Sequence, residues 1–380
     1  MKHIYLDNAG TTPMDPAVIK KMTDTMTATF GNASATNYYG RQARSILDNS
    51  RHVIAQSVNA QNDNEIIFTS GGTESDNTAI VGTALARKDL GKHVITTSIE
   101  HEAVLKPMHF LETQGFEVTY LPVDQNGEIS LEDLKRSLRD DTILVSIMTG
   151  NNEVGAKMPI HEIGAIVADS NAWFHTDAVQ AYGLLDIDVK KDNIDLLSTS
   201  AHKLNGPKMC GFLYCRADHN YESILKGGDQ ELKRRAGTEN IPAIAGFAEA
   251  VKLNSSKVKF DHRQNYYGFK HQLVDGLKNN GIDVAVNGKL DEGELPHVIN
   301  LWFKDRPADV LLTNLDLKGI SASAGSACTA GSLEPSHVLT AMYGKGSPRI
   351  SESLRFSFGA FNTAADIEAV ITALTSIIKK

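Results

Sequence analysis

The sequence predicts an α/β fold, with a large, doubly wound and mostly parallel sheet domain followed by a smaller α+β domain. From about residue 16 to residue 255, short β-rich runs alternate with helical segments. Several of these runs are apolar almost throughout and are bounded by Gly, Asn or Asp, which is typical of strands in a sheet covered on both faces. After about residue 256 a long polar helix and fewer strands follow. We therefore assign residues 16–255 to the large domain, and residues 1–15 and 256–380 to the small one.

Each predicted element follows from a local pattern. The amphipathic stretches Leu131–Leu138 and Ile160–Ala168 predict helices between strands. The first dozen residues show no helical pattern and are expected at the domain junction. In the small domain we expect a helix over His262–Asn279, strands over His297–Phe303 and Leu354–Phe358, and a final helix over Ala364–Lys379. The predicted strands of the large sheet are Glu65–Ser70, His93–Ile99, Phe116–Val123, Thr142–Met148, Trp173–Thr176, Asp195–Thr199 and Gly211–Cys215.

Composition argues against several classes of function. The net charge of −8, from 38 basic and 46 acidic residues, disfavours direct nucleic-acid binding, and the basic cluster at Lys233–Arg235 is too short to change that. No signal-peptide pattern or membrane-length apolar run is present, so no membrane association is expected. Three cysteines do not make a disulfide framework, which predicts a reducing, cytoplasmic location.

The three cysteines have different settings. Cys210 and Cys215 flank a short apolar strand and are expected to be small core residues rather than metal ligands. No set of residues at metal-ligand spacing is evident, so no metal is expected. Cys328 lies in Ser321–Ser332, where every other side chain except Thr329 is Ser, Ala or Gly. Such a stretch has little to bury and is expected to be a mobile, accessible loop, which suits a nucleophile better than a core residue.

Polar residues follow five of the predicted strands, at the edge where ligands bind in open α/β sheets. We expect these residues to meet in one site. They are Gly71–Asn77, Glu100 and His101, Asn151–Glu153, Asp177 and Gln180, and Ser200, His202 and Lys203.

Three of these groups suggest a specific cofactor. The strand–Gly71–Gly72–Thr73–helix pattern fits either an anion site or a capped turn. Lys203 is either a surface lysine or one that forms a Schiff base with a carbonyl substrate or with pyridoxal phosphate, whose phosphate Ser200 and His202 could reach. Pyridoxal phosphate also needs a carboxylate beside its pyridine nitrogen, and Asp177 ends an apolar strand earlier in the chain. Together the three parts point to pyridoxal phosphate.

At this point the chain resembles the cysteine desulfurases of the class V aminotransferase family, group I type. The resemblance implies the fold of fold-type I pyridoxal-phosphate transferases, and its motifs run in family order over almost the whole chain. The matching segments are Tyr5–Thr12, Phe68–Asn77, Glu100–His101, Asn151–Gly155, His175–Gln180, Ser200–Pro207, Arg235–Asn240, Gly325–Thr329 and Leu354–Phe358.

The resemblance also implies roles for individual residues. Lys203 would hold the cofactor, His101 would stack on its ring and move protons, Asp177 would pair with the ring nitrogen, and Gln180 would contact the ring hydroxyl. Asn152 and Arg355 would bind the substrate carboxylate. The phosphate would be bound by Gly72, Thr73, Ser200 and His202, and by Thr238 from the neighbouring subunit of a homodimer.

The implied reaction converts L-cysteine to L-alanine. The Cys328 thiolate would attack the substrate sulfur and become a persulfide, which a sulfur-acceptor protein would receive for iron–sulfur cluster assembly or for thiolation of tRNA or cofactors. The alternatives are a selenocysteine lyase, another pyridoxal enzyme acting on a small amino acid, or a non-catalytic scaffold for sulfur transfer. Ala33, Asn37 and Asp229 depart from the family pattern, which puts in doubt the rate and the partner surface more than the reaction.

Overall fold

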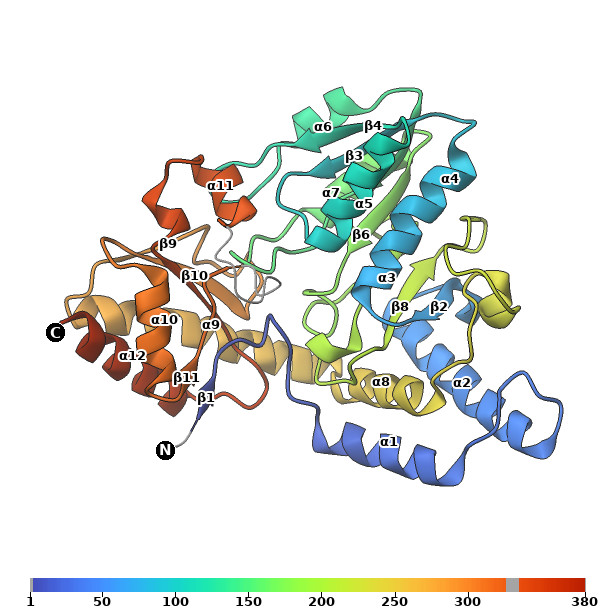
Figure 1. Cartoon of the computed structure of the whole chain (residues 1–380), viewed down its shortest axis with the longest axis horizontal. Helices are drawn as coiled ribbons and strands as arrows, with labels where there is room; N and C mark the ends of the chain where they lie inside the picture. Colours follow the sequence, from blue (N-terminus) through green and yellow to red (C-terminus); the bar gives the residue numbers. More distant parts are fainter. Residues whose placement is uncertain (1–2, 326–334, 380) are drawn as a thin grey trace.

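The structure is a computed structural model that describes residues 3–325 and 335–379. Within these residues the large sheet has seven strands in the order β2-β8-β7-β6-β5-β3-β4 (Figure 1). The strands from β7 to β4 are parallel, and β8 is antiparallel to both of its neighbours. The prediction of a mostly parallel sheet is therefore confirmed. The strands are β2 (Ile66–Thr69), β3 (His93–Thr97), β4 (Glu117–Leu121), β5 (Thr142–Ser146), β6 (Trp173–Asp177), β7 (Leu196–Ser198) and β8 (Gly211–Cys215).

Helices cover both faces of this sheet, which explains the continuous apolar strands. Adjacent residues of one strand enter different cores: Ile95 packs with the core that holds Phe174 and Phe247, whereas Val94 packs with the core that holds Met108. Because successive side chains of a strand point to opposite faces, both sets have to be apolar. The helices here are α1 (Pro16–Ala28), α2 (Tyr38–Ser57), α3 (Gly72–Asn77), α4 (Thr83–Arg87), α5 (Glu102–Thr113), α6 (Leu131–Ser137), α7 (Ile160–Ala168) and α8 (Ile241–Leu253).

The C-terminal part forms a separate small sheet with its own apolar core (Figure 1). Its antiparallel strands have the order β12-β10-β9, with β9 at Val284–Val286, β10 at Val298–Phe303 and β12 at Ser353–Ser357. The helices that pack in this core are α9 (Ser256–Asn279), α10 (Ala308–Asp316) and α12 (Ala364–Ile378), whereas the buried side chains of α11 (His337–Tyr343) pack in a core of the large sheet. The predicted α+β character is therefore present, and the domain boundaries at residues 15 and 255 stay a prediction.

The N-terminal segment connects the two sheets, and no residue from 3 to 15 is helical. β1 (Ile4–Tyr5) pairs in parallel with β11 (Ile320–Ser321). Further along, the Thr12 amide donates to the His202 carbonyl at 3.0 Å. This path brings residues 9–12 against the loop that carries Lys203.

The start of α9 and the presence of two short strands differ from the sequence prediction for local reasons. The helix predicted over His262–Asn279 begins at Ser256, because the Ser255 hydroxyl caps it by accepting from the Val258 amide. The strands β9 and β11 contain three and two residues, which is too short for an alternating pattern to show in the sequence.

Among the residues that the structure describes, no helix has both the length and the apolar character needed to cross a membrane. The same residues contain no group of three or more His, Cys, Asp or Glu side chains that could hold a metal ion.

Candidate active site

One cavity of about 290 Å³ brings together ten of the twelve residues that the sequence analysis selected. It lies where the ends of β3, β5, β6 and β7 and the turn after β2 meet the N-terminal segment and β12. The predicted residues that line it are Gly72, Thr73, His101, Asn152, Asp177, Gln180, Ser200, His202, Lys203 and Arg355. Ala9, Gly10, Asp76, Met148, Gly150 and Val179 also line it, and sequence reasoning gave none of these six a role.

The turn after β2 requires its two glycines. Gly71 has φ +145° and ψ −175°, a conformation that L side chains rarely adopt. A Cβ on Gly72 would lie 2.7 Å from Cγ2 of Val179, so only glycine lets the turn approach the segment after β6 this closely. The Glu74 carboxylate fixes the turn by accepting from the Ser70 amide at 2.8 Å. The turn therefore presents Gly72 and Thr73 to the cavity in a defined position.

Lys203 lies directly beneath the N-terminal segment. Its Nζ donates to the carbonyl oxygens of Ala9 and, at 2.8 Å, of Gly10. The neighbouring His202 places Nδ1 3.0 Å from the Thr11 hydroxyl. Burial, followed by the charges of Lys203 and Lys208, lowers the pKa of His202 to about 4, so its imidazole is neutral at pH 7. Lys203 is thus held in the cavity next to a neutral histidine.

Three buried carboxyl groups lie at this edge of the sheet. Asp177 accepts from the Val179 amide at 2.8 Å; burial raises its pKa, while the charges of His101 and Lys203 oppose that rise. Burial, followed by the charge of Asp177, raises the pKa of Asp76 well above its usual range. Burial also raises the pKa of Glu100 to about 8, although Glu100 Oε1 accepts from the Thr97 hydroxyl and the Met148 amide. Of the three carboxyl groups, Asp177 is therefore the one whose charged form is stabilised by nearby positive charges, those of His101 and Lys203.

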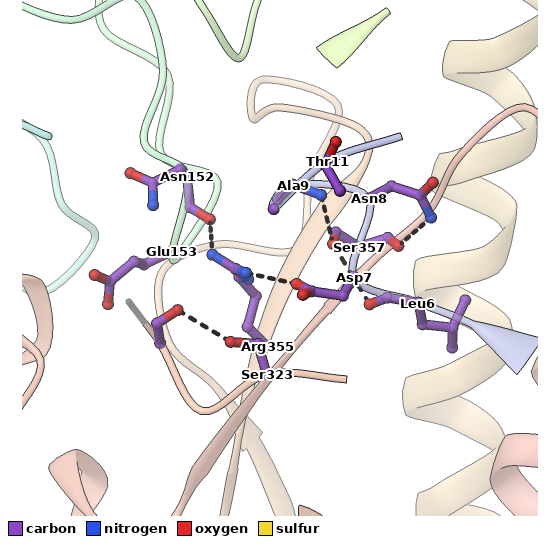
Figure 2. A network of polar contacts seen from close by, with 12 residues as sticks. Leu6, Asp7, Asn8, Ala9, Thr11, Asn152, Glu153, Ser323, Arg355 and Ser357 are labelled. Carbon is purple, nitrogen blue, oxygen red and sulfur yellow. Dashed lines mark hydrogen bonds and ion pairs between the residues drawn. The ribbon is translucent and has the colours of Figure 1, made fainter. Parts of the chain in front are cut away.

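Arg355 lines the cavity from β12 and is fully buried, and Figure 2 shows its contacts with Asp7 and Asn152. Its Nη1 donates to the Asn152 carbonyl at 3.1 Å, and its Nη2 pairs with Asp7 Oδ1 at 2.6 Å. No side-chain or backbone partner of Nε is found within the described residues. The guanidinium is thus oriented by Asp7, a residue that the sequence analysis quoted only as part of a motif.

Cys328 lies outside the described residues, but the described chain on both sides of it contacts Arg355, which lines the cavity, and Glu153, the neighbour of the lining residue Asn152. On one side, Ser323 and Arg355 exchange two backbone hydrogen bonds, at 2.6 and 3.1 Å. On the other side, the Ser336 hydroxyl donates to Glu153 Oε2, the neighbour of Asn152. The described residues that flank the stretch 326–334 are therefore bonded to Arg355 and to Glu153.

Thr238 does not line the cavity; it is exposed on a loop that two ion pairs anchor. Arg235 donates from Nε to Glu74 Oε1 at 2.8 Å. Glu231 makes two hydrogen bonds with the buried Arg51, at 2.6 and 2.8 Å. The loop that carries Thr238 is therefore attached to α3, next to Thr73.

The comparisons with known proteins agree with this geometry. Residues 4–370 match the Aminotransferase class-V family, so the chain has the fold of a class-V aminotransferase. A Bacillus subtilis (strain 168) protein provisionally named cysteine desulfurase IscS 1 is 53% identical over the full length of both chains. A Methanosarcina thermophila protein named cysteine desulfurase IscS is 47% identical, over all of this chain and 93% of its own.

A solved structure of a NifS-like protein superposes with a TM-score of 0.92 and 32% identity, with all of both chains covered. A NifS-like protein from Rickettsia africae ESF-5 gives 0.88 and 30%, again over both whole chains. The chain belongs to the cysteine desulfurases of the class-V aminotransferase family.

Proposed function

We propose that this protein is a pyridoxal-phosphate-dependent cysteine desulfurase that converts L-cysteine to L-alanine and places the sulfur on Cys328. The observation that carries the proposal is that a lysine, a buried carboxylate, a glycine turn and a buried arginine line one cavity. The names of the relatives from Bacillus subtilis and Methanosarcina thermophila support the same activity.

The residues present fit pyridoxal phosphate. Gly72 approaches Val179 so closely that a side chain at position 72 would not fit. Thr73 and Ser200 line the same part of the cavity and offer backbone and hydroxyl donors for a phosphate. Asp177 offers the carboxylate that a protonated pyridine nitrogen needs, Gln180 a hydrogen bond to the ring hydroxyl, and Lys203 the amine that would hold the cofactor. When bound, pyridoxal phosphate supplies an electron sink for the substrate's α-carbon.

The chain's own residues would then orient the substrate and move its protons. Arg355 and Asn152 hold the substrate carboxylate, which fixes the α-carbon relative to Lys203. Lys203 Nζ and the His101 ring transfer protons at the α-carbon and at the departing sulfur. His101 is held for this role at the start of α5, where its Nδ1 accepts from the Ala103 amide at 3.1 Å.

Cys328 would complete the reaction as nucleophile. Its thiolate attacks the substrate sulfur, so that a sulfur–sulfur bond forms and the carbon–sulfur bond of the substrate breaks. The electron pair of that bond and a proton remain with the carbon skeleton, which leaves as alanine. The overall change, L-cysteine and a Cys328 thiol to L-alanine and a Cys328 persulfide, needs no external oxidant or reductant.

We further propose a homodimer in which Thr238 contacts the phosphate in the neighbouring subunit. Thr238 is exposed and lies outside its own chain's cavity, and Arg235 and Glu74 hold its loop beside Thr73. A cytoplasmic location, proposed from the cysteine content, agrees with Cys210 and Cys215 being free thiols. The persulfide sulfur would pass to an acceptor protein, for iron–sulfur cluster assembly or for thiolation of tRNA or cofactors.

The test is incubation of the purified protein with L-cysteine, pyridoxal phosphate and a thiol reductant, with alanine and sulfide measured together. We expect equal yields of alanine and sulfide. If neither product formed, the result would favour the scaffold alternative. Parallel reactions with L-selenocysteine separate a desulfurase from a selenocysteine lyase.

Two variants assign the roles. Cys328→Ala should keep the visible absorbance of the bound cofactor but form no persulfide and no alanine, whereas Lys203→Ala should lose that absorbance. Cys210→Ala is the matched control, because burial raises the pKa of the Cys210 thiol to about 12 and keeps it from acting as a thiolate. Alanine release by Cys328→Ala at the parent rate would show that Cys328 is not the acceptor.

A further inference from the structure

A buried histidine, His297, lies directly behind Gln180. It precedes β10 and is 5% exposed. Its Nε2 is 3.0 Å from Gln180 Oε1, and Gln180 Nε2 donates to the Ala9 carbonyl, also at 3.0 Å. Sequence reasoning treated His297 only as the first residue of a predicted strand. Its position connects the small sheet to a side chain that lines the cavity.

The Ala9 carbonyl defines which way the Gln180 amide points. A carbonyl oxygen can only accept, so the amide nitrogen has to face Ala9 and the amide oxygen has to face His297. His297 must then carry its proton on Nε2. This tautomer agrees with His297 Nδ1, which is buried without a partner among the described residues: a proton there would be a buried donor with no acceptor.

The Ala9 carbonyl is itself held in place. The Ala9 amide donates to the Ser357 hydroxyl on β12 at 2.8 Å (Figure 2). On its other side the same carbonyl accepts from Lys203 Nζ. The acceptor that orients Gln180 is therefore anchored both to the small sheet and to the lysine loop.

The charge state of His297 stays constant over the working range of pH. Burial, followed by the charges of Lys270, Lys203 and Arg355, lowers the pKa of His297 to about 3. A neutral imidazole has one donor, and Gln180 Oε1 uses it. The second amide proton of Gln180 is then the one polar hydrogen of that side chain left for a molecule in the cavity.

We propose that His297 is a positioning residue that holds the Gln180 amide with its N–H toward the cavity, so that Gln180 donates to the oxygen on the ring of the bound cofactor. The inference rests on the proposed function and extends it to a residue that touches neither cofactor nor substrate. Without the donor at His297, Gln180 Oε1 would be buried and unpaired, and the Ala9 carbonyl would be left as the one contact that holds the amide.

Two substitutions at this position separate donation from packing. The side-chain nitrogen of glutamine in His297→Gln matches the place of Nε2, whereas the nitrogen of asparagine in His297→Asn matches the place of Nδ1. The affinity for pyridoxal phosphate is measured by spectroscopic titration of the apoprotein, and the melting temperature is measured alongside. We expect His297→Gln to bind like the wild type and His297→Asn to bind about fivefold to tenfold more weakly, the loss expected for one hydrogen bond.

A double-mutant cycle with Gln180→Leu gives the decisive comparison. In that background, the change from histidine to asparagine at position 297 should no longer affect cofactor affinity. His219 is another buried histidine, whose ring centroid lies 3.9 Å from that of Trp173. The variant His219→Gln controls for general loss of stability and should leave the affinity for pyridoxal phosphate unchanged.

The outcomes distinguish the two proposals. Equal affinities for wild type, His297→Gln and His297→Asn, or an effect of asparagine that persists without Gln180, would overturn the positioning role while leaving the proposed function intact. A wild-type protein with no affinity for pyridoxal phosphate would overturn the proposed function.

Discussion

Replacing Glu100 with glutamine should remove a large part of the pH dependence of stability. Glu100 is fully buried between the ends of β3 and β5, where Thr97 and Met148 donate to its Oε1 and no partner of Oε2 is found within residues 3–325 and 335–379. Burial raises its pKa from 4.5 to about 8. Glu100 is therefore a neutral acid at pH 7, which glutamine matches in shape and charge.

The magnitude follows from the two pKa values. Between pH 4.5 and pH 8 the folded protein keeps the Glu100 proton and the unfolded chain does not. Since the folded state binds more protons, the free energy of unfolding falls as pH rises, by about 1.4 kcal/mol per pH unit. The contribution is complete below pH 4.5 and is lost as pH rises to about 8. From pH 6 to pH 8 the loss is about 2 kcal/mol, once ionisation of the folded group near pH 8 is included.

The assay is urea unfolding of the cofactor-loaded protein at pH 6 and pH 8. The wild type should lose about 2 kcal/mol more than Glu100→Gln over this interval. Other groups that titrate there, such as Glu294 with a pKa raised by burial to about 7, are common to both proteins and cancel in the difference. The control with the same change of side chain is Glu102→Gln on α5, where the glutamate is partly exposed and pairs with Lys106. Parallel pH profiles for the wild type and Glu100→Gln would refute the reasoning, because they would mean that Glu100 ionises normally in the folded protein.

Three further predictions concern packing and substrate binding. Glu231→Ala leaves the buried Arg51 without its carboxylate and should lower the free energy of unfolding by about 3–5 kcal/mol, as measured by urea titration. Asp24→Ala, which removes an exposed ion pair with Lys20, should lower it by less than about 1 kcal/mol. Similar losses in the two variants would contradict the importance of the buried pair. Gly268→Ala should raise the melting temperature, because an added Cβ at this position of α9 meets nothing within 4 Å. Gly164→Ala should lower the melting temperature, because an added Cβ would clash with the Asp192 carbonyl oxygen. A lower melting temperature for Gly268→Ala than for Gly164→Ala would contradict this packing. Arg355→Lys should raise KM for L-cysteine by about tenfold or more, since an ammonium cannot both hold the contacts to Asp7 and Asn152 and offer a planar edge to a carboxylate; an unchanged KM would remove Arg355 from substrate binding.

The sequence predicted the large sheet well because its strands carry their own signal. Gly211–Cys215 was predicted to the residue, since a strand covered on both faces is apolar throughout and is bounded by turn residues, and this holds for β8 although it is antiparallel to both neighbours. Nine site residues could be expected in one place because the carboxyl ends of parallel strands meet at one edge, whereas Arg355 on β12 was expected there only from the resemblance. The small domain was predicted less completely, because β9 and β11 are too short to show a local pattern, and β11 is stabilised by pairing with the distant N-terminal strand β1.

The residues that sequence reasoning missed act through tertiary contacts. Asp7 and Ala9 belong to a quoted motif, but their partners Arg355 and Gln180 are more than 170 positions away in the chain. His297 looked like the start of a strand, and only the folded chain places its ring against Gln180. Asp76 lies within Gly71–Asn77, which was expected at the site, but only the folded chain shows that it is buried beside Asp177.

The three buried carboxyl groups give the cavity its charge distribution. Burial makes ionisation unfavourable at Glu100 and Asp76, while Asp177 has the charges of His101 and Lys203 and the amide of Val179 to stabilise its ionised form. Asp177, at the end of β6 where the proposed function needs a carboxylate, is thereby the one of the three whose ionised form nearby cations stabilise. Above pH 4.5, the buried Glu100 lowers the stability of the folded protein. Its side chain also has a structural role, because it accepts hydrogen bonds from Thr97 and Met148 and so joins the ends of β3 and β5. These bonds fix the start of the segment that carries His101. Glu100→Gln should therefore gain stability at neutral pH without disturbing those bonds, which is the result expected when a buried acid is retained for the geometry that it imposes on a site.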